Sequence, residues 1–121
     1  MVLVTSNKAK RLLCVRYIGH VRPPDLARHR PDVEALMAEL PPAFRVLADL
    51  TELEAMDLEC MTEIGRLMEL IDRSGVGLIV RVIPDPGKDI GLNIFSIFHY
   101  PHRPQIATCK SLVEAGKLLG L

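Results

Sequence analysis

The sequence predicts an α/β fold with a largely parallel sheet of about four strands and alternating helices. Short apolar segments of strand length alternate four times with longer segments whose apolar residues recur at helical spacing. Proline and glycine separate several of these segments, as expected where strands and helices end. Alternation of this kind is typical of a parallel sheet, because a crossover between parallel strands needs a helix.

The first strand and helix are predicted before residue 41. Arg11 to Val21 is rich in branched and aromatic residues, which favours a strand, and the residues Arg22 to Pro24 end it. Asp25 is placed to cap a helix that runs to about Leu40, where a pair of prolines stops it. One face of this helix is apolar: Val33, Leu36, Met37 and Leu40.

The second strand and helix follow. Phe44 to Leu50 is nearly continuously apolar, as expected of a central strand covered on both faces. A loop is predicted over residues 51–56, and Asp57 is placed to cap a long helix before Gly75, which stands where a terminator belongs. The helix carries an apolar stripe: Cys60, Ile64, Leu67, Met68 and Ile71.

The remaining elements complete the pattern. Val76 to Ile83 predicts a buried strand, and Asp89 to Tyr100 predicts a helix after a loop rich in proline and glycine. A short strand over residues 104–108 precedes a last helix that ends near Leu119, with the capping-box residues Ser111 and Glu114 at its start. No repeat or domain boundary is visible, so residues 1–121 are expected to form one domain.

Composition narrows the classes of function. The 121 residues are 49% hydrophobic, which is enough for a single core. The 15 basic residues balance the 15 acidic ones and only 4% of residues are aromatic, so no nucleic-acid partner is expected. No apolar run approaches the roughly 20 residues of a membrane span, and no secretory signal is seen. Three widely spaced cysteines favour buried thiols in a reducing compartment, so a cytoplasmic location is expected.

Charge is unevenly distributed along the chain. Residues 1–30 hold seven basic residues and one acidic residue, whereas residues 49–72 hold eight acidic residues and one basic residue. One interpretation is that both stretches form solvated faces that meet within the fold. The other is that the acidic stretch docks a basic partner.

Two stretches resemble a known family. The first is "FRVLADLTELEAMDLECMTEIGRLMEL", Phe44 to Leu70, in which an apolar strand ends in Asp49 and Asp57 opens a helix. The second is the tail "QIATCKSLVEAGKLL". Both resemble the STAS domain, the fold of bacterial anti-sigma-factor antagonists, and especially its sporulation-antagonist-like branch, which is also compared with CRAL-TRIO lipid carriers. The resemblance implies a single STAS-like domain and a non-enzymatic regulatory or protein-interaction role.

The sequence departs from the signalling members of that family at the start of the helix. Leu58 and Glu59 stand where those proteins carry a phosphorylatable hydroxyl just after the helix-opening Asp. A kinase has no substrate hydroxyl there. Glu59 either imitates a permanent negative charge at a helix N-terminus or is simply a favourable first-turn residue.

The loop before the predicted third helix does not match a phosphate-binding loop. Gly87 and Lys88 are followed by Asp89, where such a loop requires Ser or Thr. Lys88 remains a candidate anion contact at the helix start, although Asp89 more simply caps the helix. The helix itself has more apolar surface than one sheet contact needs, so it is a packed core helix, a dimer or protein interface, or the wall of an apolar pocket.

The sequence therefore favours an interaction module without cofactor, metal or catalytic residue. It is expected to act as a homodimer or within a regulatory complex, and a protein partner is expected at Glu52, Glu54, Asp57 and Glu59. A ligand or interface contact is expected at Phe95, Phe98, His99 and Tyr100. The alternative is a carrier or sensor of a lipid or other apolar small molecule, and an enzyme that uses His99 or Cys60 ranks third.

Overall fold

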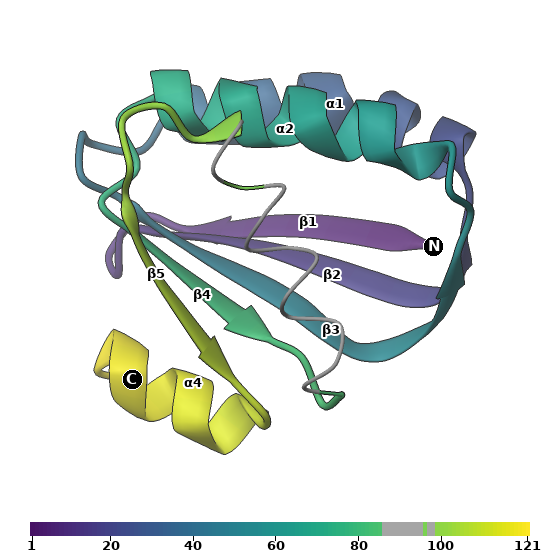
Figure 1. Cartoon of the computed structure of the whole chain (residues 1–121). Coiled ribbons are helices and arrows are strands. Elements are labelled where there is room, and N and C mark those ends of the chain that lie inside the picture. The colour runs from purple at the N-terminus through teal and green to yellow at the C-terminus, as the bar shows by residue number, and fades with distance from the viewer. Residues whose placement is uncertain (86–95, 97–98) are drawn as a thin grey trace.

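The structure, a computed structural model, describes residues 1–85, 96 and 99–121 (Figure 1). Its elements are β1 (Val2–Asn7), β2 (Leu12–Val21), α1 (Pro23–Ala38), β3 (Arg45–Met56), α2 (Cys60–Arg73), β4 (Leu78–Val82), β5 (Gln105–Cys109) and α4 (Leu112–Leu119). None of the helices in this described part is long and apolar enough to cross a membrane.

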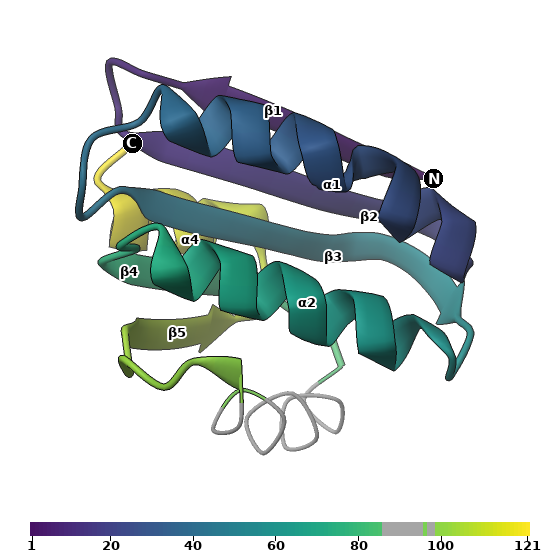
Figure 2. The same ribbon diagram turned by 90° about the horizontal axis from the view of Figure 1, so that it is seen from above.

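The five strands form one mixed sheet in the order β1-β2-β3-β4-β5. β1 is antiparallel to β2, and the other three pairings are parallel. Helices α1 and α2 lie side by side over one face, whereas α4 covers part of the opposite face (Figures 1 and 2). The predicted α/β class with a largely parallel sheet is therefore confirmed.

The sheet differs from the prediction at two strands. β1 was not predicted. It is antiparallel to β2 and is joined to it by only the short turn over residues 8–11, since such a pair needs no crossover helix. β1 therefore lies outside the alternation of strands and helices on which the prediction was based. The predicted loop over residues 51–56 is instead the second half of β3, which stays paired with β2 as far as Met56. Two register shifts and a positive φ of 68° at Gly19 let β2 follow this extension.

Helix ends confirm part of the predicted capping. Ser111 accepts a hydrogen bond from the Glu114 amide (3.2 Å), and Gly75 has a φ of 87° just beyond α2, as expected of a terminator. The Asp25 carboxylate accepts from the Arg22 amide (2.9 Å), but from the third helical position rather than from the cap itself. The prediction that Asp57 caps α2 is wrong: Glu59 occupies the cap position, and Asp57 pairs with His20.

Apolar side chains form a core on each face of the sheet. Alternation along β4 sends Ile79 toward α1 and α2, whereas Val80 and Val82 pack with Ala115 and Leu119 of α4. The central strands are thus covered on both faces, as expected for parallel pairing.

The basic and acidic stretches of the sequence meet in the fold, as one of the two interpretations expected. Arg16 contacts Glu52 (2.6 Å) and the buried Asp49 (3.3 Å). On the other face of the sheet, which α1 and α2 cover, Arg30 pairs with Glu63 and joins the two helices. Much of the acidic stretch is therefore neutralised within the chain.

Two histidine–carboxylate pairs attach residues 99–102 to α2. His99 Nδ1 lies 2.9 Å from Glu69 Oε1, and His102 Nδ1 lies 2.5 Å from Asp72 Oδ2. Asp72 is buried, and its other carboxylate oxygen accepts from the His102 amide at 3.3 Å. The partners are three residues apart on both sides, so one helical turn of α2 holds this segment in place.

Gly65 gives the His99 ring room to pack on α2. A Cβ atom at residue 65 would lie 2.7 Å from His99 Cε1, closer than such atoms approach in proteins. Glycine in a helix interior costs about 1 kcal/mol relative to alanine. The close packing of the His99 ring explains why this helix position carries glycine despite that cost.

We expect the effect of Gly65→Ala on the free energy of unfolding to change sign when His99 is replaced by alanine. In the native background it should destabilise the fold by about 1–3 kcal/mol through overpacking against the ring. In a His99→Ala background it should stabilise by up to about 1 kcal/mol through helix propensity. Urea unfolding of the four proteins of this double-mutant cycle measures the coupling. Additive effects would show that the ring does not restrict residue 65.

Candidate ligand-binding site

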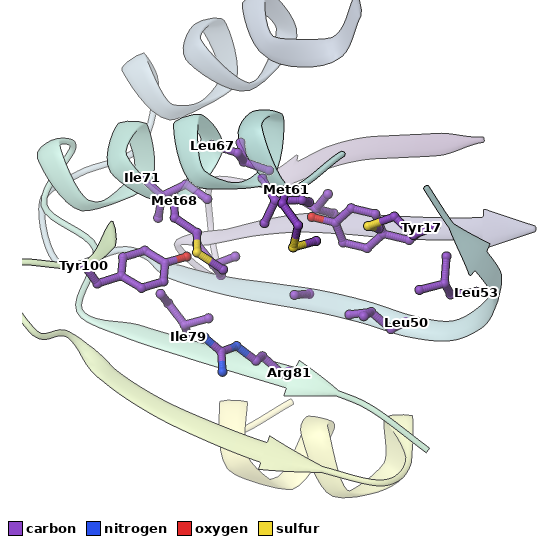
Figure 3. Close-up of a pocket in the computed structure, with 15 residues that line it drawn as sticks. Tyr17, Leu50, Leu53, Met61, Leu67, Met68, Ile71, Ile79, Arg81 and Tyr100 are labelled. Carbon is purple, nitrogen blue, oxygen red and sulfur yellow. The ribbon is translucent and has the colours of Figure 1, made fainter. Parts of the chain in front are cut away.

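A cavity of about 180 Å³ lies between the sheet and α2 (Figure 3). Fifteen described residues line it, and twelve of them are aliphatic residues or methionines. The other three are Tyr17, Arg81 and Tyr100. The site is therefore apolar with a small number of polar groups, as is typical of small-molecule pockets.

The cavity exists because α2 stands farther from the sheet than α1 does. α1 makes close backbone contacts with β1 and β2, whereas the close backbone contacts of α2 are mainly with α1. From α2 the long side chains of Met61, Leu67 and Met68 reach toward the sheet (Figure 3). Flexible methionines tolerate an irregular space of this kind.

Strand alternation places the floor of the cavity. Residues two apart on each strand face α2, such as Val15 and Tyr17 on β2 and Ile79 and Arg81 on β4. Between them β3 contributes Ala48, whose small side chain leaves room at a central strand.

Three polar side chains face this apolar space. Arg81 is 3% exposed and donates a hydrogen bond to the Ser96 hydroxyl, one of its partners. Tyr17 and Tyr100 are 7% and 5% exposed, and Figure 3 shows their hydroxyls directed into the space between sheet and helix. Burial raises the pKa of both phenols, and Arg81 partly opposes this rise in each. Both tyrosines therefore stay protonated at neutral pH.

Neither phenol hydroxyl hydrogen-bonds to another residue in the described part of the chain. Every fully enclosed side-chain oxygen and nitrogen of those residues does have a partner, so the two hydroxyls are not fully enclosed by protein. Both tyrosines line the cavity, so an occupant with a polar group can pair with their hydroxyls.

The predicted contact residues have different positions. Tyr100 lines the cavity, whereas His99 packs beside Gly65 and Glu69. Phe95 and Phe98 lie outside the described residues, as do the candidate anion contact Lys88 and most of the helix predicted from Asp89 onward.

The acidic residues predicted to bind a partner divide into two pairs. Glu52 and Asp57 are engaged by Arg16 (2.6 Å) and His20 (2.5 Å). Glu54 and Glu59 are exposed, and neither forms an ion pair with any residue that the structure describes. Leu58, between them in sequence, is 82% exposed.

Tyr17 and Arg81 were missed by the sequence analysis. Arg81 is the single charged residue in the apolar strand Val76 to Ile83, and that isolated charge was the available signal. A charge is rarely buried without a specific role or partner. Tyr17 had no such signal, because an aromatic residue in a strand is ordinary.

The groups considered for catalysis are engaged elsewhere. Cys60 is fully buried, its thiol lies 3.5 Å from the Val21 carbonyl, and burial raises the pKa of that thiol, which lowers its reactivity. His99 faces Glu69 instead. Within residues 1–85, 96 and 99–121, no group of three His, Cys, Asp or Glu side chains is placed to hold a metal ion.

No protein-family model and no curated protein matches this sequence. Solved structures do match. One is an uncharacterized protein of the DUF3478 family with a SpoIIAA-like fold from Shewanella loihica PV-4, with a TM-score of 0.75, 14% identity, and coverage of 98% of this chain and 92% of that one.

Two further matches are to SpoIIAA itself. The anti-sigma factor antagonist SpoIIAA in its unphosphorylated form matches with a TM-score of 0.64 and 12% identity over 100% of both chains. The Bacillus cell fate determinant SpoIIAA in the phosphorylated form matches with a TM-score of 0.61 and 12% identity, over 98% of this chain and 99% of that one. The chain therefore has a STAS-like, SpoIIAA-like fold, as the sequence resemblance implied.

The two tyrosines provide a test of the site, because the chain has two tyrosines and no tryptophan. Their folded pKa lies above the unfolded value of about 10, so folding is most favoured below that pH and loses stability as pH rises past it. As pH is raised, we expect tyrosinate absorbance to appear only when the protein unfolds. The rise in absorbance and the loss of the circular dichroism signal should therefore occur in the same transition. Tyr17→Phe should halve the absorbance change. Tyrosinate that forms near pH 10 in the folded protein would contradict the burial.

Proposed function

We propose that this chain is a STAS-like binding module that takes up an apolar small molecule between its sheet and α2. The observation that carries the proposal is the cavity of about 180 Å³ with its largely apolar lining. A dry apolar cavity of roughly 150 Å³ is large enough to bind benzene. The natural occupant is accordingly a compact molecule, or the compact apolar end of a larger one.

We further propose that the protein acts by binding rather than by catalysis. Its fold supports this, because one of the proteins that share it is described as an anti-sigma factor antagonist. Fold likeness is an analogy, so the site itself must provide the function. Three free thiols, two of them buried, support action in the reducing cytoplasm.

Filling the cavity should abolish binding. Ala48→Leu places a larger side chain at the cavity floor, and the matched control Ala55→Leu makes the same change at an exposed position of β3. We expect native mass spectrometry of the purified native protein and of Ala55→Leu to show a retained mass that denaturation removes. Ala48→Leu should lack that mass, and ligand extracted from the native protein should raise the melting temperature of the control only.

Equal retention of the extra mass by Ala48→Leu would place its binding site elsewhere. Native protein of unmodified mass that also shows no thermal shift with compact apolar probes such as benzene would refute the carrier. The same spectra report whether the chain is a monomer or the expected homodimer.

A second candidate function is docking of a basic protein partner at the start of α2. The observation that favours it is the exposed Leu58, which lies between Glu54 and Glu59 in the sequence; neither glutamate has an ion pair with described residues. An exposed apolar residue flanked by unneutralised charge suits a contact in which charge steers and an apolar side chain anchors.

Reversing those two charges should remove the partner and leave the fold intact. We expect Glu54→Lys with Glu59→Lys to abolish co-purification of a partner that the native chain retains, with an unchanged melting temperature. The control variant, Glu34→Lys with Glu39→Lys, changes the net charge by the same amount at two exposed positions, one on α1 and one at its end. It should retain the partner. Loss of the partner in both variants would indicate a general charge effect, and retention in both would exclude this surface.

A further inference from the structure

Three hydrogen-bond donors from separate parts of the chain meet the same apolar cavity. Tyr17 belongs to β2, Arg81 to β4, and Tyr100 to the segment held on α2 by two histidine–carboxylate pairs. Figure 3 shows the three side chains around the same space, and burial is common to all of them. They are the polar groups of an otherwise apolar lining.

The two hydroxyls give this region a reason to hold a ligand. Both tyrosines are more than nine-tenths buried, and neither hydroxyl has a hydrogen-bond partner among the residues that the structure describes. Buried tyrosine hydroxyls usually find a partner. Both tyrosines line the cavity, so an occupant can provide that partner.

The chemistry of the donors indicates the kind of group they accept. A guanidinium only donates hydrogen bonds, and its five N–H groups allow it to hold a ligand oxygen in addition to Ser96 and its other partners. Each protonated phenol donates one more. A carboxylate offers two oxygens with about four acceptor sites and a charge opposite to that of Arg81.

We infer that the ligand is a compact apolar carboxylic acid whose carboxylate binds Arg81 and the hydroxyls of Tyr17 and Tyr100. The inference rests on the proposed function, since it names the class of molecule that the cavity takes. The apolar remainder of the ligand occupies the space beside Ala48, Leu67 and Met68. A volume of about 180 Å³ suits one aromatic ring or a short branched chain.

Three probes of matched shape test the inference: phenylacetate, phenylacetamide and phenethylamine. Isothermal titration calorimetry of the full chain at neutral pH measures their affinities. We expect phenylacetate to bind about tenfold or more tightly than phenylacetamide, and phenethylamine to bind most weakly, because hydrogen bonds to charged groups are the stronger ones. Equal affinities for acid and amide, or a preference for the amine, would overturn the carboxylate and leave the cavity as an apolar site. No binding of any probe to the native chain would overturn the proposed function as well.

Variants separate the roles of the donors. Arg81→Met should remove the preference for acid over amide while amide binding remains. Tyr17→Phe and Tyr100→Phe keep the shape of each side chain, remove only a hydroxyl, and should each weaken phenylacetate several-fold with little effect on the amide. If Arg81→Met fails to fold, these two tyrosine variants still test whether the polar groups bind the carboxylate. Unchanged phenylacetate affinity in both would show that the hydroxyls do not bind the carboxylate.

Discussion

The need to cover both faces of a parallel sheet organises this protein. Strands β2, β3 and β4 are adjacent and follow one another in the chain, so two crossovers of the same hand place α1 and α2 on the same face. The opposite face of the central strands would then be open to water. α4 solves this by packing Ala115 and Leu119 against Val80 and Val82.

Two helices that share one face need not approach the sheet equally. α1 lies close to β1 and β2, while α2 is held from its sides, by Arg30 on Glu63 and by the histidines on Glu69 and Asp72. These lateral contacts position α2 without bringing it down onto β3. A ligand that binds in the cavity of the folded chain stabilises that state, which links occupancy directly to stability.

The elements that were predicted correctly depend on short-range patterns. The helical stripe of α2, the terminator Gly75 and the Ser111 cap are each readable within a few residues. Residues 51–56 were misread as a loop because of their two glutamates, although polar and apolar residues alternate there as in a half-buried strand. The pairing of Asp57 with His20 joins positions 37 residues apart, which no local pattern reveals.

The cavity lay beyond sequence reasoning for a related reason. Its polar groups come from β2, β4 and a segment near residue 100, and the contacts that hold α2 join side chains about 30 residues apart in the sequence. The amphipathic stripe of α2 predicts which side chains face the sheet, but not how far away the sheet lies. Tyr100 was nevertheless among the predicted contact residues, and it is a wall of the cavity.

The two candidate functions meet on β3. In its second half Leu53 and Met56 line the cavity, while Glu54 is exposed and Asp57, Leu58 and Glu59 follow directly. A ligand that touches Leu53 and Met56 therefore contacts the strand that carries the acidic surface. If the acidic surface has two arrangements, the ligand can shift the equilibrium between them only by the difference in its binding free energy for the two. The irregular pairing of β2 and β3, with register shifts beside Gly19, lies at this same end of the sheet. The proposed ligand site and the proposed docking surface are thus joined by one strand.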